Sequence, residues 1–353
     1  MKQKKYIDFR LSLNETLIIK GIAICFMLWH HLFFETLDYG NVVFQIAQFG
    51  KVCVSLFLFV SVYGLTIQYG KICDKSIEST FKFQAKIFVK FYANYWAVFL
   101  VFVPIGVFVF GRSLNISYED SNPVKAIIVD FMGINGFQSY NITWWFNQLI
   151  ISLYFLFPIL YFVAKKWPIL ILIGSIVLWK LYLPILPEGI HYWIFIFALG
   201  IVYTLYIDKL NHFFNRFNFC ALLILLLLIF SALCYCRNYQ VIPYFNGIRV
   251  DAFLAVNIVL LTLLIIRCKI ATHTYISSVL SFLGKHSINI YMVHTFIYYY
   301  YFENFIYSFK YPLFIFVVLL AISLSISIII EYGKKIVGLP VLINNINNKI
   351  DVH

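Results

Sequence analysis

Charged residues are scarce in this chain of 353 residues. They make up 12% of the sequence, whereas hydrophobic residues make up 62%. A soluble domain averages about 25% charged and about 45–50% apolar residues. Apolar runs close to 20 residues long recur from one end to the other, and each is long enough to cross a hydrocarbon core about 30 Å thick. The composition therefore excludes an ordinary soluble enzyme and predicts an all-α integral membrane protein.

Groups suited to metal or carboxylate chemistry are also few. Among the seven cysteines, Cys234 and Cys236 come closest to a metal-ligand pair, but their spacing is one residue short of the zinc-type pattern. Acids in the apolar runs stand only at the ends, as Asp251, Glu303 and Glu331, so no two carboxylates share a helical face. We therefore expect no metal site, no carboxylate acid–base pair and no proton-driven relay.

Ten apolar segments predict a single bundle of about ten transmembrane helices. The expected spans are residues 17–34, 45–68, 92–110, 146–163, 168–184, 191–207, 219–236, 251–267, 288–303 and 312–332. With the N-terminus in the cytoplasm, twenty of the 27 Lys and Arg residues fall on the cytoplasmic side and five on the other. The positive-inside rule predicts such an excess. We therefore expect both termini to be cytoplasmic and the protein to lie in the cytoplasmic membrane.

This distribution also explains the net charge of +12. The basic residues follow the membrane topology, so we expect contact with the lipid bilayer and no binding of nucleic acid. Residues 1–353 are expected to form one domain, with an ordered extracytoplasmic loop at about 111–145 and a short polar cytoplasmic tail from residue 333. The loop either covers a site that opens outward or is a passive connector, and both interpretations stay open.

The first apolar helix carries a cation and a titratable base. Lys20 and His31 are eleven residues apart, which corresponds to a rise of roughly 16 Å along a helix. Ionisable groups in a bilayer are costly and mark functional sites by default. The alternative is that Lys20 reaches the interface and His31 is an ordinary polar residue. Adjacent helical residues point about 100° apart, so we expect His30 and His31 not to face the same site.

Further landmarks follow at fixed places along the chain. They are Phe57–Ser61, Lys86–Trp96, Trp145 with Tyr154 and Pro158, and Leu283–His294. Together with the string Lys20-Gly-Ile-Ala that leads to His31, these segments resemble the membrane-bound acyltransferase-3 family of bacterial O-acyltransferases. The resemblance covers about residues 15–300, and its register puts the family's histidine on His31.

Several positions depart from the family pattern and indicate a divergent member. Lys20 stands where arginine is usual, and a lysine cannot replace a bidentate guanidinium. The other departures are Ser55 at a common acid position, Val62 for glycine, Ala93 for proline, and Ile150 and Ile151 where many members carry glutamate.

The resemblance implies transfer of an acetyl or other acyl group from acyl-CoA to a hydroxyl of a cell-surface or lipid-linked carbohydrate. Histidine titrates near neutral pH, so His31 is the candidate base or acyl carrier, and Lys20 completes the predicted catalytic pair. Lys86 and Lys90 are expected to hold the phosphates of the donor. Acetyl-CoA is then a substrate, and no bound cofactor is expected. Its extended pantetheine arm is on the order of the 16 Å rise from Lys20 to His31.

Four residues are predicted to bind the carbohydrate acceptor: Ser61, Trp145, Tyr291 and His294. For His294 a plain hydrogen bond between helices is an equal alternative. Lys51 contacts substrate or reaches the outer membrane interface, and the sequence favours neither.

Two other classes of function remain open at this point. A transporter or flippase for lipid-linked sugars predicts an internal helix repeat with broken helices in matching halves, and the sequence has neither. A non-catalytic partner in envelope polysaccharide synthesis agrees with the departures from the family pattern. The sequence does not identify the acceptor sugar or the oligomeric state.

Overall fold

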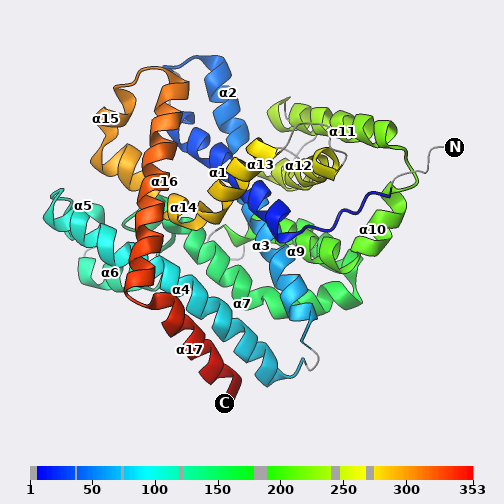
Figure 1. Ribbon diagram of the computed structural model, residues 1–353, viewed down its shortest axis with the longest axis horizontal. Coiled ribbons are helices and arrows are strands. Elements are labelled where there is room, and N and C mark those ends of the chain that lie inside the picture. The colour runs from blue at the N-terminus through cyan, green and yellow to red at the C-terminus, as the bar shows by residue number, and fades with distance from the viewer. Residues whose placement is uncertain are drawn as a thin grey trace.

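The fold is helical throughout the part of the chain that the structure describes. The computed structural model describes residues 6–35, 38–72, 75–118, 122–178, 189–239, 247–267 and 274–352. Seventeen α-helices, two short 3-10 helices and one π-helix occupy these ranges, and no strand occurs within them. Figure 1 shows their arrangement.

The bounds of the helices are as follows. They are α1 (Leu13–Phe33), α2 (Asn41–Gly50), α3 (Cys53–Gly70), α4 (Ile77–Phe108), α5 (Leu114–Ser117), α6 (Pro123–Phe131), η1 (Gly136–Gln138), η2 (Ile142–Trp144), α7 (Trp145–Lys166), α8 (Pro168–Leu178), α9 (Ile190–Leu205), α10 (Ile207–Phe214), α11 (Phe219–Tyr239), α12 (Ile248–Arg267), α13 (Thr274–Lys285), α14 (Ser287–Thr295), the π-helix η3 (Phe296–Tyr301), α15 (Glu303–Tyr307), α16 (Pro312–Ile336) and α17 (Leu339–Val352).

The prediction of an all-α membrane protein is confirmed, but the count of about ten spans is not. Within the described ranges, seven helical segments are long and apolar enough to cross a membrane. An eighth is added if α9 and α10, which meet at an angle of 78°, form one bent span.

Three expected spans differ from the observed helices. The span 92–110 is the second half of α4, which already begins at Ile77 and includes the basic residues before the apolar run. The span 168–184 is represented by the 11-residue α8, and its end lies outside the described residues. The span 288–303 is divided among the short α14, the π-helix η3 and the start of α15. Apolar composition predicted where these segments lie in the sequence, but it does not locate the positions at which a helix breaks.

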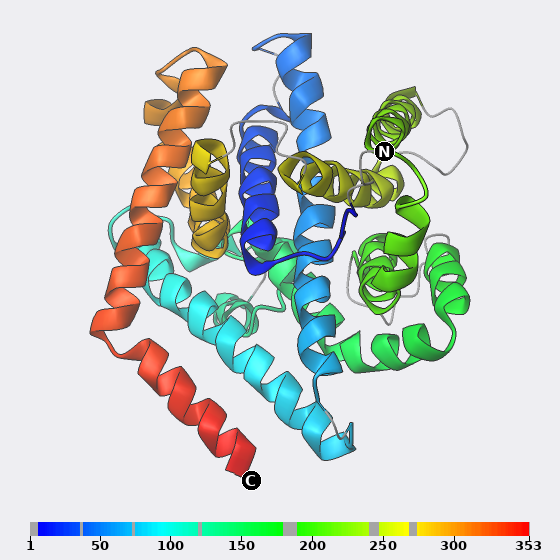
Figure 2. The same cartoon turned by 45° about the vertical axis from the view of Figure 1, so that its right-hand side comes forward.

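Helix α1 lies at the centre of the bundle between α13 and α3 (Figure 2). Its contact with α13 depends on two glycines. A Cβ atom on Gly21 would lie 2.1 Å from the carbonyl oxygen of Leu280, and one on Gly284 would lie 1.9 Å from that of Leu17. Any side chain at either position would separate the two backbones, so the glycine that follows Lys20 fixes the position of α1.

Helices α1 and α3 run in opposite directions. The Leu11 N–H, just before α1, donates to the Tyr63 hydroxyl at 2.8 Å, whereas Gly50, just before α3, packs against Phe26 and His30. The start of α3 therefore lies at the level of the end of α1. This arrangement places Lys20 and His31 at different depths beside α3.

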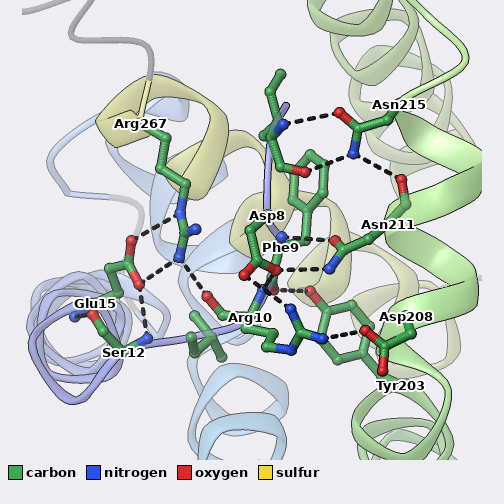
Figure 3. A network of polar contacts seen from close by, with 12 residues as sticks. Asp8, Phe9, Arg10, Ser12, Glu15, Tyr203, Asp208, Asn211, Asn215 and Arg267 are labelled. Atoms are coloured by element: carbon green, nitrogen blue, oxygen red, sulfur yellow. Dashed lines mark hydrogen bonds and ion pairs between the residues drawn. The ribbon is translucent and has the colours of Figure 1, made fainter. Parts of the chain in front are cut away.

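The segment before α1 is bound by a polar network that we call the N-terminal clamp (Figure 3). The Phe9 N–H donates to Asn211 Oδ1 at 2.8 Å, and Asn211 Nδ2 donates to Asp8 at 2.7 Å. Arg10 pairs with Asp8 and Asp208. The remaining members are Ser12, Glu15, Tyr203, Asn215 and Arg267. The clamp ties the entrance of α1 to α9, α10 and α12.

The region 111–145 is folded around the buried carboxyl of Asp130. Asp130 Oδ2 accepts hydrogen bonds from the Tyr140 N–H at 2.6 Å and the Tyr118 hydroxyl at 2.8 Å, and the Tyr95 hydroxyl donates to the Asp130 carbonyl at 2.6 Å. Burial raises the pKa of the Asp130 carboxyl above its usual value, although these hydrogen bonds act in the opposite direction.

The polar region after residue 333 is also ordered. Helix α16 continues to Ile336, and α17 then packs along the first half of α4 (Figures 1 and 2). Lys86 of α4 forms an ion pair with Asp351 of α17. The polar tail is therefore a helix that covers α4, a feature that its Asn-rich composition did not predict.

Candidate functional site

A cavity of about 1100 Å³ lies beside α1 and α3 and contains most of the predicted site residues. Lys51 and Lys71, which flank the two ends of α3, both line it, so the cavity extends over roughly 30 Å along that helix. Lys20, His31, Ser61, Lys90, Trp145 and Tyr291 also line it. These residues come from α1, α3, α4, α7 and α14, and the fold brings them together.

The charged side chains that line the cavity are all basic. Four lysines and three histidines line the cavity, and no described lining residue is an aspartate or glutamate. In the described chain, no group of three or more His, Cys, Asp or Glu side chains is arranged to hold a metal ion. A site with this lining favours an anionic ligand.

His31 forms a hydrogen bond with His294 across the boundary between α1 and α14. The Nδ1 atom of His31 lies 2.8 Å from the Nε2 atom of His294, and the two rings stack with their centroids 4.8 Å apart. His294 is fully buried, whereas His31 is partly exposed to the cavity. His294 therefore lies behind His31, away from the open space.

The hydrogen bonds of His294 determine which nitrogen of His31 carries the proton. The Nδ1 atom of His294 lies 2.7 Å from the carbonyl oxygen of Tyr291, and a carbonyl only accepts. Nδ1 is thus the donor, and in the neutral ring Nε2 is an acceptor. His31 must then donate from its own Nδ1, which leaves a lone pair on its Nε2. That nitrogen makes no hydrogen bond to any residue that the structure describes.

His30 also lines the cavity, so the expectation that only one of the two neighbouring histidines faces the site is wrong. The reason is the width of the cavity, which is large enough to contact side chains that point about 100° apart. His30 Nδ1 donates to the carbonyl of Ala47 at 2.7 Å, so His30 is held on the α2 side. His31 is held on the α14 side.

The predicted donor-binding lysines are only partly brought together. Lys20 and Lys90 line the same end of the cavity and lie close enough for their charges to interact. Neither ammonium group forms an ion pair within the described part of the chain. Lys86 is outside the cavity, one turn nearer the start of α4, where it pairs with α17.

Three of the four predicted acceptor residues, Ser61, Trp145 and Tyr291, line the cavity, and the fourth, His294, lies behind its wall. The Trp145 ring lies between the Phe137 ring, at 5.3 Å, and the Trp193 ring, at 6.5 Å. The Tyr291 hydroxyl donates to the carbonyl of Thr143 at 2.8 Å and so joins α14 to η2. Ser61 lines the cavity opposite α7.

The region 111–145 contributes to the wall and to the support of His294. Phe137 and Thr143 line the cavity. The Thr143 hydroxyl lies 3.0 Å from that of Thr295, and the Trp144 indole N–H donates to the carbonyl of Met292 at 3.2 Å. The region is thus part of the site and is not a passive connector.

One polar cluster beside the cavity was missed in the sequence. Lys334 of α16 is buried and donates to Asn94 at 2.7 Å, to Asn289 at 3.1 Å and to Glu331 at 2.8 Å. Asn94 lines the cavity one turn after Lys90, and that i,i+4 spacing was the available signal. Nothing in the sequence linked it to Lys334, which is 240 residues away.

Comparison with known proteins supports the same interpretation. The profile of a family described as an acyltransferase domain, acyltransferase-3, matches residues 13–332, which is nearly the whole chain. No curated protein and no solved structure matches the chain. The matched region contains every residue of the cavity wall from Leu13 onward. The chain belongs to the acyltransferase-3 family, and its cavity is the candidate active site of a membrane acyltransferase.

Proposed function

We propose that this protein transfers an acetyl group from acetyl-CoA to a hydroxyl of a cell-surface or lipid-linked carbohydrate. The observation that carries the proposal is the position of Lys20 and His31 on one helix, eleven residues apart, in one cavity. The donor binds at the Lys20 end and the reaction takes place at the His31 end.

The donor end is suited to the phosphates of coenzyme A. Lys20 and Lys90 present two ammonium groups to the cavity, and no described lining residue offers an acid to neutralise them. Charge-assisted hydrogen bonds to phosphate are stronger than neutral ones. The helical rise from Lys20 to His31, roughly 16 Å, then lets an extended pantetheine arm present its thioester at His31.

At the other end, His31 Nε2 acts on the acceptor hydroxyl. It accepts the hydroxyl proton while the hydroxyl oxygen attacks the thioester carbonyl. The tetrahedral adduct then collapses to the acetyl ester and expels the thiolate, which takes the proton from His31 Nε2 and leaves as coenzyme A. The same lone pair also permits the second route, in which His31 carries the acetyl group before it passes to the acceptor. In both routes, His294 Nε2 accepts a hydrogen bond from the Nδ1–H group of His31 and so stabilises the positive charge that His31 gains.

The aromatic part of the wall supports a carbohydrate acceptor. Trp145, Tyr154 and Trp193 line the cavity, and ligand sites combine flat apolar surfaces with a few polar groups. Ser61 and Tyr291 supply hydroxyl groups there. His294 does not contact the acceptor directly and acts on it only through its hydrogen bond to His31.

We also propose that the lysine end faces the cytoplasm, with both termini on that side of the cytoplasmic membrane. Counted on the ten spans predicted from the sequence, twenty of the 27 Lys and Arg residues fall on that side, which supports this orientation. A cytoplasmic donor then serves an acceptor that is reached from outside.

The test is acetyl transfer measured by mass spectrometry on surface polysaccharide from cells that express the wild type or His31→Ala. Purified protein supplies a second readout, the release of coenzyme A from acetyl-CoA. General acid–base catalysis contributes about 10²–10⁴-fold, so we expect His31→Ala to lower transfer by that factor. Binding of acetyl-CoA should stay unchanged, because His31 is remote from the phosphates.

His30→Ala is the matched variant, since it removes a neighbouring imidazole from the same wall. His30→Ala should reduce acetyl transfer far less than His31→Ala does. Acetyl transfer that survives His31→Ala at equal membrane levels would sink the catalytic assignment. Incubation with acetyl-CoA alone, followed by intact-mass measurement, separates the two routes, because only an acyl carrier gains the mass of an acetyl group.

A further inference from the structure

Lys51 is a cation within the apolar part of the bundle. It connects α2 to α3 in the continuous apolar segment Asn41–Gly70, ten residues after the start, which is roughly 15 Å along the segment. Its side chain lines the cavity. A lysine that reaches the membrane interface lies at the end of its span, and Lys51 therefore does not match that description.

The acid nearest to Lys51 is already paired. Asp251 is fully buried, and its Oδ1 accepts a hydrogen bond from Arg237 Nε at 2.6 Å. Arg237 also donates to the carbonyl of Gln48 at 2.7 Å, so it is fixed beside the Asp251 carboxylate. This pair is neutral as a unit. The charge of Lys51 is therefore in excess, and no described residue forms an ion pair or hydrogen bond with its ammonium group.

One further feature makes this end of the cavity favourable for an anion. His30 and His31 of α1 line the cavity at the same level. A charged side chain inside a membrane protein is costly and marks a ligand path when it faces a cavity.

We propose that Lys51 binds an anionic group of the acceptor, so that the acceptor is an acidic saccharide that carries a carboxylate or a phosphate. This inference rests on the proposed acyl transfer. The phosphates of the donor are held at Lys20 and Lys90, and the thioester lies at His31. Lys51 lies at the level of His30 and His31, roughly 16 Å along α1 from Lys20, so phosphates held at Lys20 do not reach it. The remaining ligand of the cavity is the acceptor.

The experiment measures binding, not turnover, with purified protein in lipid nanodiscs. Each of two probe pairs compares an anionic compound with its neutral counterpart: methyl β-D-glucuronide with methyl β-D-glucoside, and glycerol 3-phosphate with glycerol. Wild type, Lys51→Met and Lys51→Arg are compared. Lys125→Met, which removes an exposed lysine of α6 outside the cavity, controls for the loss of one net charge.

We expect the wild type and Lys125→Met to bind the charged member of at least one pair about tenfold or more tightly than the neutral member. Lys51→Met should abolish this preference, and Lys51→Arg should retain it. A preference confined to glucuronide identifies a carboxylate acceptor, and one confined to glycerol 3-phosphate identifies a phosphate acceptor. Coenzyme A binding, measured on the same samples, should be equal in wild type and Lys51→Met.

Three results would overturn the proposal: no wild-type preference for either charged probe, a preference that persists in Lys51→Met, or a loss of coenzyme A binding in Lys51→Met. The last result would assign Lys51 to the donor. Failure of the acyl transfer itself is detected separately, because it removes coenzyme A release in the wild type without affecting the binding of the sugar probes.

Discussion

The N-terminal clamp and the cavity both concentrate polar side chains in a largely apolar protein, but only the clamp pairs its charged side chains with one another. In the clamp, Asn211 bonds to both Asp8 and the Phe9 N–H, and Arg267 pairs with Glu15 (Figure 3). Burial acts to raise the pKa of Asp8, but hydrogen bonds from Arg10 and Asn211 outweigh it, and the pKa lies below its usual value. In the cavity, Lys20, Lys51 and Lys90 have no acidic partner among the described residues.

This difference separates two uses of polar groups. A paired buried group contributes to folding, because removing its partner leaves an unsatisfied donor or acceptor. An unpaired cation costs folding free energy, and it is compatible with a stable protein when a ligand supplies the missing charge. We therefore expect substitutions in the clamp to lower stability and substitutions in the cavity to lower binding.

Among the substitutions that compare the cavity with the clamp, Lys20→Met is expected to have the largest effect. Hydrogen bonds to charged groups contribute about 1.5–3 kcal/mol each, so KM for acetyl-CoA should rise roughly tenfold to a hundredfold. The melting temperature should not fall, because the substitution removes an unpaired cation. Acetyl-transfer kinetics and thermal unfolding of the same detergent-purified samples measure both quantities. A clear loss of stability with normal KM would show that Lys20 belongs with the clamp residues.

Asn211→Ala is expected to have the opposite pattern. It leaves the buried Phe9 N–H without an acceptor, which costs about 1–3 kcal/mol of unfolding free energy. Thermal unfolding should report that loss, while KM for acetyl-CoA stays at the wild-type value. Lys209→Ala, at an exposed position of the same helix, is the control and should leave both unchanged. A raised KM in Asn211→Ala at normal stability would contradict the separation.

His294→Ala tests a residue that belongs to both classes, since it is fully buried and also bonds to His31. One lost hydrogen bond of about 0.5–1.5 kcal/mol predicts a fall in kcat of roughly threefold to tenfold with KM for acetyl-CoA unchanged. The pH profile of kcat should shift as well, because the proton of His31 is then no longer fixed on Nδ1. A purely structural role would leave that profile in place.

The sequence predicted the cavity-facing residues of helices better than it predicted the helices themselves. Lys20 and His31 are separated by one uninterrupted helix, so their spacing translated directly into depth. Lys90 is likewise on a continuous helix, α4, and reaches the same cavity. The distance between two residues of one continuous helix follows from their separation in the sequence, so it can be predicted without the structure.

Contacts between distant segments were not predictable in the same way. The pairing of His31 with His294 joins residues 263 positions apart, and it depends on the packing of α13 and α14 against α1. The ion pair that removes Lys86 from the donor end depends on α17, which composition alone identified as a polar tail.

The smallest effect is expected for Asp130→Asn, which tests whether a third polar centre resembles the clamp. One amide oxygen can still accept from the Tyr140 N–H and the Tyr118 hydroxyl, so stability at neutral pH should change little. Because burial raises the pKa of Asp130, the folded state binds a proton more readily than the unfolded state, and wild-type stability gains from Asp130 as the pH falls toward the unfolded pKa. Asp130→Asn should lack that gain in unfolding scans compared between neutral and mildly acidic pH. A loss of stability as large as that of Asn211→Ala would instead show that the carboxylate charge itself is needed, as it is for the paired acids of the clamp.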